Sequence, residues 1–87
     1  MASYRVEVKP SAKKELERLS NRLIARITRR LETLAPNPRP PGCKKLKGGD
    51  KEWRVRVGDY RVVYIVDDQE LLVEVTRIRH RKDVYER

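Results

Sequence analysis

Arginines follow two neighbouring stretches of the chain in which apolar and charged residues alternate. The segment 53–64 reads WRVRVGDYRVVY, and Gly58–Asp59 supplies the residues of a tight turn between two strands. Arg54 and Arg56 are two positions apart and share a face of their strand, and Arg61 follows on the next strand. Guanidinium groups hold phosphate oxygens and could stabilise an RNA phosphodiester under attack by its own 2′-hydroxyl group. The spacing alone favours a simpler hypothesis, in which exposed arginines keep a sheet edge soluble.

A second basic cluster, RIRHRK at residues 77–82, ends a later strand and contains the only histidine. His80 could exchange a proton in acid–base catalysis, although a lone histidine also fits a simple polar role at a strand end. Tyr85 could stack on an unpaired base, or it could fix the tail to the core. We interpret Trp53, which alternates with the arginines, as a core residue.

The elements before these strands read as one strand and two helices. Residues 3–9 alternate with period two, which predicts a half-buried strand, and Pro10 ends it and suits a first helical turn. Apolar residues at helical spacing predict a helix over 10–19 and a second one from Ser20, as its N-cap, to about residue 35. We interpret the basic residues on the second helix as solvated rather than as RNA contacts: Arg22, Arg26, Arg29 and Arg30.

Residues 36–50 separate the helices from the later strands. Four prolines and three glycines predict a loop without regular structure, with Leu46 as its anchor to the core. Three lysines in this segment could contact a phosphate backbone or simply be solvated: Lys44, Lys45 and Lys47.

The last two strands complete the fold. Residues 60–66 are apolar at nearly every position, which predicts a central strand covered on both faces, and residues 70–79 predict a fourth strand after a turn at Asp67–Asp68. The order β-α-α-β-β-β indicates an α+β fold. We expect one domain over 1–87, in which a helical hairpin packs on a small, mainly antiparallel four-stranded sheet with the first strand at an edge.

Composition narrows the possible partners and compartment. The 22 Lys and Arg against 13 Asp and Glu give a net charge of +9 and a pI near 10.1, which favours nucleic acid or another acidic partner. Cys43 is alone, which favours a reducing cytoplasm. We expect a soluble protein with no membrane association, because no apolar run approaches the roughly 20 residues that a bilayer requires. HExxH, phosphate-loop and Cys-His motifs are absent, and we expect no metal or other cofactor.

The combination KKLKG, WRVRVGDYRVVYIV and RHRKDVY resembles the RelE family of bacterial and archaeal toxins, within the RelE/ParE superfamily, over essentially the whole chain. The resemblance implies a ribosome-dependent endoribonuclease that cuts mRNA in the A site by 2′-hydroxyl attack. It also implies a RelB-like antitoxin that wraps the toxin in a hetero-oligomeric complex. The alternatives are a ParE-like inhibitor of gyrase and a non-catalytic protein of the same fold that binds RNA or the ribosome.

The resemblance implies site residues as well. Arg54 and Arg56 match the basic pair of the second strand, Arg61 the arginine after the turn, Arg81 the arginine that ends the fourth strand, and Tyr85 the C-terminal tyrosine. The well-studied branch has lysines at the strand pair. Because arginine stays protonated, we expect this pair to stabilise charge rather than to act as a base. Proton transfer would then fall to Tyr85, to His80 or to no discrete base.

Overall fold

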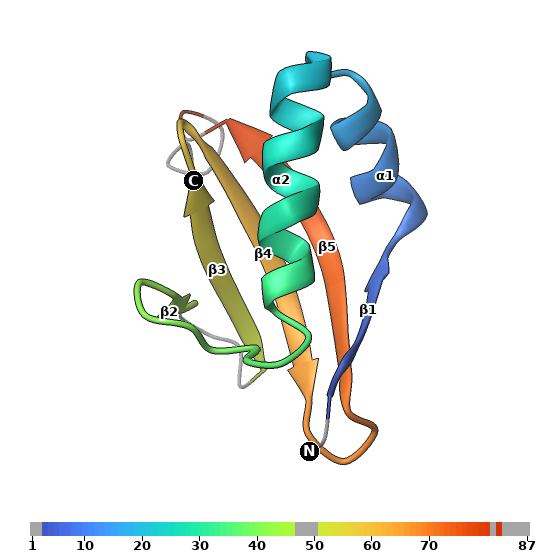
Figure 1. Cartoon of the computed structure of the whole chain (residues 1–87), viewed down its shortest axis with the longest axis vertical. Helices are drawn as coiled ribbons and strands as arrows, with labels where there is room; N and C mark the ends of the chain where they lie inside the picture. The colour runs from blue at the N-terminus through green and yellow to red at the C-terminus, as the bar shows by residue number, and fades with distance from the viewer. Residues whose placement is uncertain (1–2, 47–50, 81, 83–87) are drawn as a thin grey trace.

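The computed structural model describes residues 3–46, 51–80 and 82, which form a five-stranded sheet with two helices on one face (Figure 1). The strand order is β1-β5-β4-β3-β2, with β1 parallel to β5 and all other pairs antiparallel. The predicted α+β class and the edge position of the first strand are confirmed. The elements are β1 Arg5–Val8, α1 Pro10–Glu17, α2 Asn21–Thr33, β2 Lys44–Lys45, β3 Glu52–Val57, β4 Tyr60–Asp67 and β5 Leu72–His80.

The described sheet has one strand more than the sequence predicts. Strand β2 pairs with β3, Lys44 opposite Arg54 and Lys45 opposite Trp53, within the segment that we expected to be an irregular loop. That expectation was wrong at these two residues. A strand of two residues has no alternation of its own to detect, because it is defined only by its pairing with a segment further along the chain.

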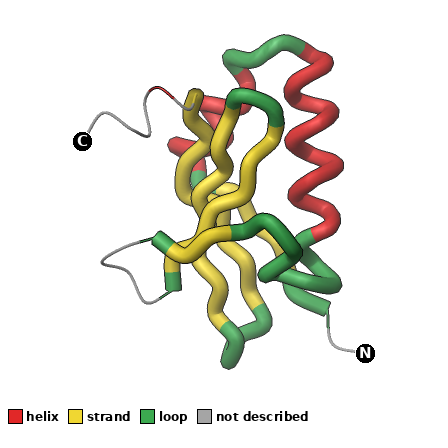
Figure 2. Tube along the Cα trace, turned by 90° about the vertical axis from the view of Figure 1, so that its left-hand side faces the viewer, coloured by secondary structure: helices red, strands yellow, loops and turns green. Residues whose placement is uncertain are grey.

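The helices begin and pack largely as their sequences indicate. The Ser20 side chain accepts a hydrogen bond from the backbone N–H of Leu23 at 3.2 Å, which is the predicted N-cap of α2. Ile27 and Leu31 are buried on the inner side of α2, and Ala12 is buried on α1. Figures 1 and 2 show α2 as a separate layer on one side of the sheet. Neither described helix is long and apolar enough to cross a lipid bilayer.

The core lies between the helices and one face of the sheet. Alternate residues of β3, β4 and β5 point toward the helices, and aliphatic residues supply most of this layer. Tyr64 is the largest fully buried side chain, and Trp53 packs half-buried against the cluster. The fully buried sheet residues are Val55, Val62, Tyr64, Val73 and Val75.

The segment after α2 is fixed by buried prolines and by a hydroxyl group. Pro38 and Pro40 are buried, and the Tyr64 hydroxyl group donates to the Pro38 carbonyl oxygen at 2.7 Å. Burial raises the pKa of the Tyr64 hydroxyl group above its usual value. Leu46, the expected anchor, is only half-buried.

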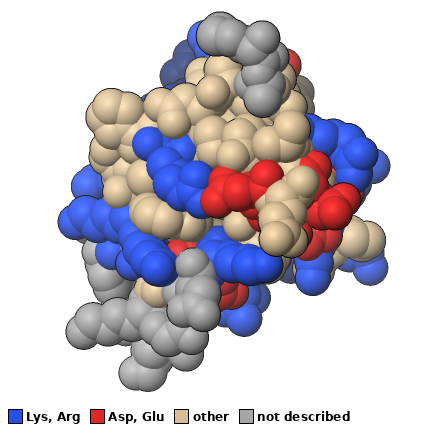
Figure 3. All heavy atoms as spheres, turned by 90° about the horizontal axis from the view of Figure 1, so that it is seen from below, with Lys and Arg blue, Asp and Glu red and all other residues tan. Residues whose placement is uncertain are grey.

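An ionic cluster joins this loop to the β4–β5 turn. Arg39 donates to both carboxylate oxygens of Asp68, at 2.9 and 3.2 Å, and its guanidinium lies 5.3 Å from the centre of the Trp53 ring. The Tyr4 hydroxyl group donates to the same carboxylate at 2.6 Å. Hydrogen bonds from Arg39 and Tyr4 lower the pKa of Asp68. Figure 3 views this end of the molecule, where acidic side chains gather with basic ones around them.

Candidate functional site

A row of arginines crosses three strands on the face of the sheet opposite to the helices, which we call the open face. Arg56 of β3 is opposite Arg61 of β4, and Arg61 is opposite Arg79 of β5. Side chains paired in this way point to the same face, with Cβ atoms typically ~4.5–5.5 Å apart. Three arginines on neighbouring strands therefore begin from one small area at the end of the sheet.

A second row of cations runs beside the first. Lys44 is opposite Arg54, Arg54 is opposite Val63, and Val63 is opposite Arg77. Val63 is only 7% exposed although no helix covers it, because it lies between these long side chains. The two rows bring together six cationic residues of four strands: Lys44, Arg54, Arg56, Arg61, Arg77 and Arg79.

A β-bulge in β5 places Arg77 and Arg79 on this face. The pairing steps from Val63–Arg77 directly to Tyr64–Val75, which leaves Thr76 as an extra residue. The Thr76 hydroxyl group donates to the Val63 carbonyl oxygen at 3.2 Å. Because one extra residue reverses the alternation of side chains, the arginines after the bulge point away from the helices, whereas Val75 before it points toward them.

Hydrogen bonds hold two of these side chains in place, and two others have buried Nε atoms. The Nε atoms of Arg54 and Arg61 are buried, and Arg56 donates from Nε to the Gly58 carbonyl oxygen at 2.9 Å. Arg79 donates from Nε to Glu15 of α1 at 2.6 Å. Arg54 and Arg56 have no carboxylate within 4 Å among the described residues, so a bound anion would meet charge that no described acid neutralises.

The far end of the open face is acidic. Glu52 of β3 and Glu74 of β5 both lie opposite Ile65 of β4, and Glu7 of β1 lies beside Glu74. Arg5 forms an ion pair with Glu7 at 2.7 Å. The open face therefore has a cationic end and an acidic end, and only the cationic end can hold a phosphate group.

The remaining site residues expected from the sequence do not join the two rows. His80 is opposite Tyr60 on the helix side of the sheet, with ring centres 5.3 Å apart and an edge-to-face angle of 84°. Its Nδ1 accepts a hydrogen bond from the Lys82 backbone N–H at 3.3 Å. Lys45 pairs with Trp53 and so points away from the open face. The expectations for Lys47, Arg81 and Tyr85 lie outside the described residues.

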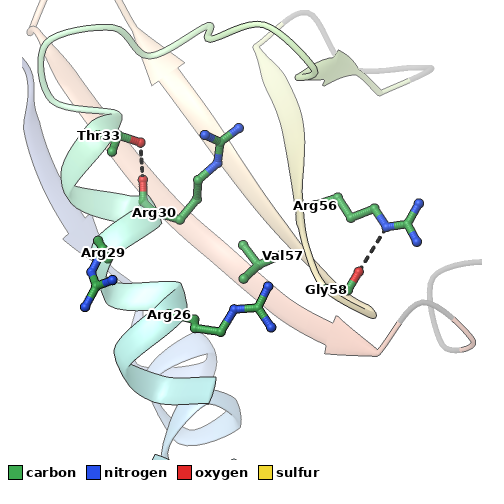
Figure 4. Close-up of a pocket in the computed structure, with 7 residues that line it drawn as sticks. All are labelled: Arg26, Arg29, Arg30, Thr33, Arg56, Val57 and Gly58. Carbon is green, nitrogen blue, oxygen red and sulfur yellow. Dashed lines mark hydrogen bonds between the residues drawn. The ribbon is translucent and has the colours of Figure 1, made fainter. Parts of the chain in front are cut away.

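A basic groove between α2 and the end of β3 was not anticipated. It has a volume of about 400 Å³ and is lined by Arg26, Arg29, Arg30, Thr33, Arg56, Val57 and Gly58. Figure 4 shows Arg26 and Arg30 reaching from α2 toward β3. We call it the α2 groove. Among the described residues, no group of three or more His, Cys, Asp or Glu side chains is placed to hold a metal ion.

Known proteins resemble this chain over nearly its whole length. A family model described as the ParE toxin of the type II toxin-antitoxin system parDE matches residues 6–85. The RelE1 protein of Methanocaldococcus jannaschii is 32% identical over 85 residues, 94% of each chain. The archaeal RelE–RelB complex of Pyrococcus horikoshii OT3 has a chain that superposes with a TM-score of 0.81 and 28% identity, covering 90% of this chain and 94% of that one. The toxin-antitoxin complex RelBE2 of Mycobacterium tuberculosis gives a TM-score of 0.80 and 26% identity, with coverage of 92% and 93%.

Proposed function

This chain belongs to the RelE family of toxins of type II toxin–antitoxin systems, and from that premise we propose that it is an endoribonuclease that cuts ribosome-bound mRNA in the cytoplasm. Cleavage in the ribosomal A site would stop translation. The observation that carries the proposal is the pair of cationic rows on the open face, which brings arginines from separate strands into neighbouring positions from which several could contact one phosphate group.

The reaction is an attack of the RNA on its own backbone. The 2′-oxygen forms a bond to phosphorus while the bond from phosphorus to the 5′-oxygen breaks, leaving a 2′,3′-cyclic phosphate and a 5′-hydroxyl group. The 2′-hydroxyl group loses a proton and the 5′-oxygen gains one. Negative charge grows on the non-bridging oxygens, and Arg54, Arg56 and Arg61 stabilise it from fixed positions.

Proton transfer needs a group other than these arginines, since arginine stays protonated. His80 lies on the opposite face and is engaged with Tyr60 and Lys82, so we give it no part in the reaction. Tyr85, which the family resemblance points to, or a water molecule accepts the proton in this scheme. Arg81 adds a further cation beside the phosphate by the same resemblance.

A RelB-like antitoxin is the proposed partner in a hetero-oligomeric complex. The solved relatives from Pyrococcus horikoshii and Mycobacterium tuberculosis are toxin–antitoxin complexes. The uncompensated cations on this chain are suited to an acidic segment that folds as it binds. Such a segment would prevent access of RNA to the open face.

Brief induction of the protein followed by mapping of mRNA 5′ ends, with and without ribosome engagement, tests the proposal. We expect cleavage of translated message only. Arg61→Ala should reduce the cleavage rate by about 10²–10³-fold, the usual effect of losing one group that stabilises transition-state charge. Arg22→Ala, an exposed arginine of α2 that lines neither the open face nor the α2 groove, is the matched control. Equal cleavage by both variants would contradict the site.

The family model, described as a ParE toxin, keeps gyrase inhibition as a second candidate. The same induction separates the two, because a ParE-like activity would produce a DNA-damage response while mRNA stays intact. Binding to ribosomes with no cut message would instead favour a non-catalytic RNA-binding protein of this fold.

A further inference from the structure

We propose that the α2 groove is a second binding site for an RNA phosphodiester backbone, distinct from the site of cleavage. Three of its four arginines come from one helix. Arg26, Arg29 and Arg30 are spaced three and four positions apart, which places them on adjoining parts of the α2 surface. None of them has a carboxylate within 4 Å among the described residues. Like charges at this spacing cost stability, and a bound anion offsets that cost.

Gly58 lines the groove beside Arg26. A Cβ atom at this position would lie 3.4 Å from Nη1 of Arg26, which is an ordinary van der Waals distance, so the guanidinium lies against the turn. Gly58 also has a φ of +60°, which an L side chain rarely adopts. One residue therefore serves both the β3–β4 turn and the close approach of a cation from α2. The groove is open to solvent and has a volume of about 400 Å³.

The groove is continuous with the open face through Arg56. This residue belongs to the first row of open-face cations and also lines the groove. A backbone bound at the cationic end of the open face cannot run along the strands past Glu52 and Glu74, which repel it. Strand β2 pairs only with Arg54 and Trp53, so the edge of β3 beyond them is left uncovered by β2. The bound RNA strand is thus directed over this edge of β3 and toward α2.

The lining favours nucleic acid over a protein segment. Four of the seven lining residues are arginines, and Val57, which is 7% exposed, is the one aliphatic side chain among them. Protein segments bind through buried apolar or aromatic anchors, and Val57 offers almost no surface to one. Guanidinium groups suit the phosphates of a nucleic-acid backbone. The inference rests on the proposed function only in its choice of RNA as the nucleic acid. Messenger RNA and ribosomal RNA both offer the phosphate backbone that the groove would bind.

The test compares two double variants of the full-length chain that each remove two charges. Arg26→Gln with Arg30→Gln alters the groove, and Arg18→Gln with Arg22→Gln is the control, because both of its arginines are exposed and outside the groove. Glutamine keeps most of the side-chain length, and circular dichroism verifies folding. The probe is a single-stranded RNA of about 12 nucleotides. Its 2′-O-methyl riboses prevent cleavage, so binding is measured whether or not the protein is a nuclease. Binding to intact ribosomes by co-sedimentation is the second arm.

We expect the groove variant to bind the RNA at least about tenfold more weakly near 0.1 M salt. The slope of log binding constant against log salt concentration should become shallower by about 1.4, the value for two lost contacts to single-stranded RNA. The control should change far less. Weaker binding of the oligonucleotide indicates message in the groove, whereas weaker binding of ribosomes alone indicates ribosomal RNA, and both support the proposal. Equal losses in the two variants, or no loss, would overturn it. So would loss of polyglutamate binding with RNA binding unchanged, which would indicate an acidic protein ligand. Failure of the nuclease test alone leaves these binding results unaffected.

Discussion

The hydroxyl group of Thr76 donates a hydrogen bond to the carbonyl oxygen of Val63, at 3.2 Å, at the one described register shift between β4 and β5. This contact holds the extra residue of the bulge against the central strand. On one side of it Val75 faces the helices, and on the other side Arg77 faces away from them. The bulge therefore lets a single strand contribute both to the core and to the cationic rows.

Thr76→Val should reduce the free energy of unfolding by about 1 kcal/mol, the usual net value of one hydrogen bond. Valine has nearly the same shape as threonine but cannot donate to Val63. Thr76→Ser keeps the hydroxyl group and is the control. Urea denaturation of the three proteins measures the difference, and a valine variant as stable as the parent would show that the hydrogen bond does not hold the bulge.

Arg54 offers a test of charge against geometry. Arg54→Ala should slow single-turnover cleavage of ribosome-bound message by about 10²-fold or more, because a group that stabilises developing charge is lost. Arg54→Lys should lose less, because it keeps the charge and gives up only the fork-shaped donor geometry. Cleavage rates at saturating ribosome complex measure both. If the lysine variant is as slow as the alanine variant, bidentate geometry rather than charge is decisive.

Tyr64→Phe should destabilise the fold by about 1–3 kcal/mol, because it leaves the buried Pro38 carbonyl oxygen without its donor. Tyr4→Phe removes a hydroxyl group from a more exposed hydrogen bond and should cost less. Since the pKa of Tyr64 is raised, its contribution is complete below the ordinary tyrosine pKa of about 10 and is lost as the pH rises from there through the folded-state value. Thermal denaturation at neutral pH measures the stability of both variants. Equal losses of stability in the two would argue against a special role for Tyr64.

Asp68→Asn should make stability less sensitive to acid. The pKa of Asp68 is lowered by Arg39 and Tyr4, so its ionic contacts stabilise the fold fully above the unfolded-state pKa of about 4 and are lost as the pH falls through the folded-state value. The parent should therefore be more stable than the variant at neutral pH, and the difference should shrink below about pH 4. Denaturation across the acidic range measures this, and a difference independent of pH would contradict the sign.

The period-two and helical patterns predicted most elements, because those periods follow directly from strand and helix geometry. They placed Arg54 and Arg56 on one face, and the Gly58–Asp59 turn brings Arg61 opposite Arg56. The same patterns could not give Arg77 and Arg79 their face, because one extra residue in β5 reverses the alternation and no local signal marks it.

Contacts between distant segments explain the other differences. Strand β2 exists only through pairing with β3, and His80 was grouped with the arginines by its neighbours in sequence although the register places it on the other face. The α2 groove needed Arg26 of the helix and Gly58 of a turn to meet, which is a property of the folded chain rather than of either segment. The charged side of α2 looks the same in sequence whether or not a groove lies beside it.

Glu15 has a consequence for how copies of this chain behave when they meet. Strand β1 pairs with β5 only as far as Val75, and beyond it Glu15 accepts the Ile78 backbone N–H at 2.8 Å and the Arg79 Nε at 2.6 Å. A carboxylate thus occupies a hydrogen-bonding position that another extended chain would otherwise take. Beyond the end of β1, the Glu15 side chain therefore blocks this edge of the sheet. Two copies of this chain cannot pair edge to edge there.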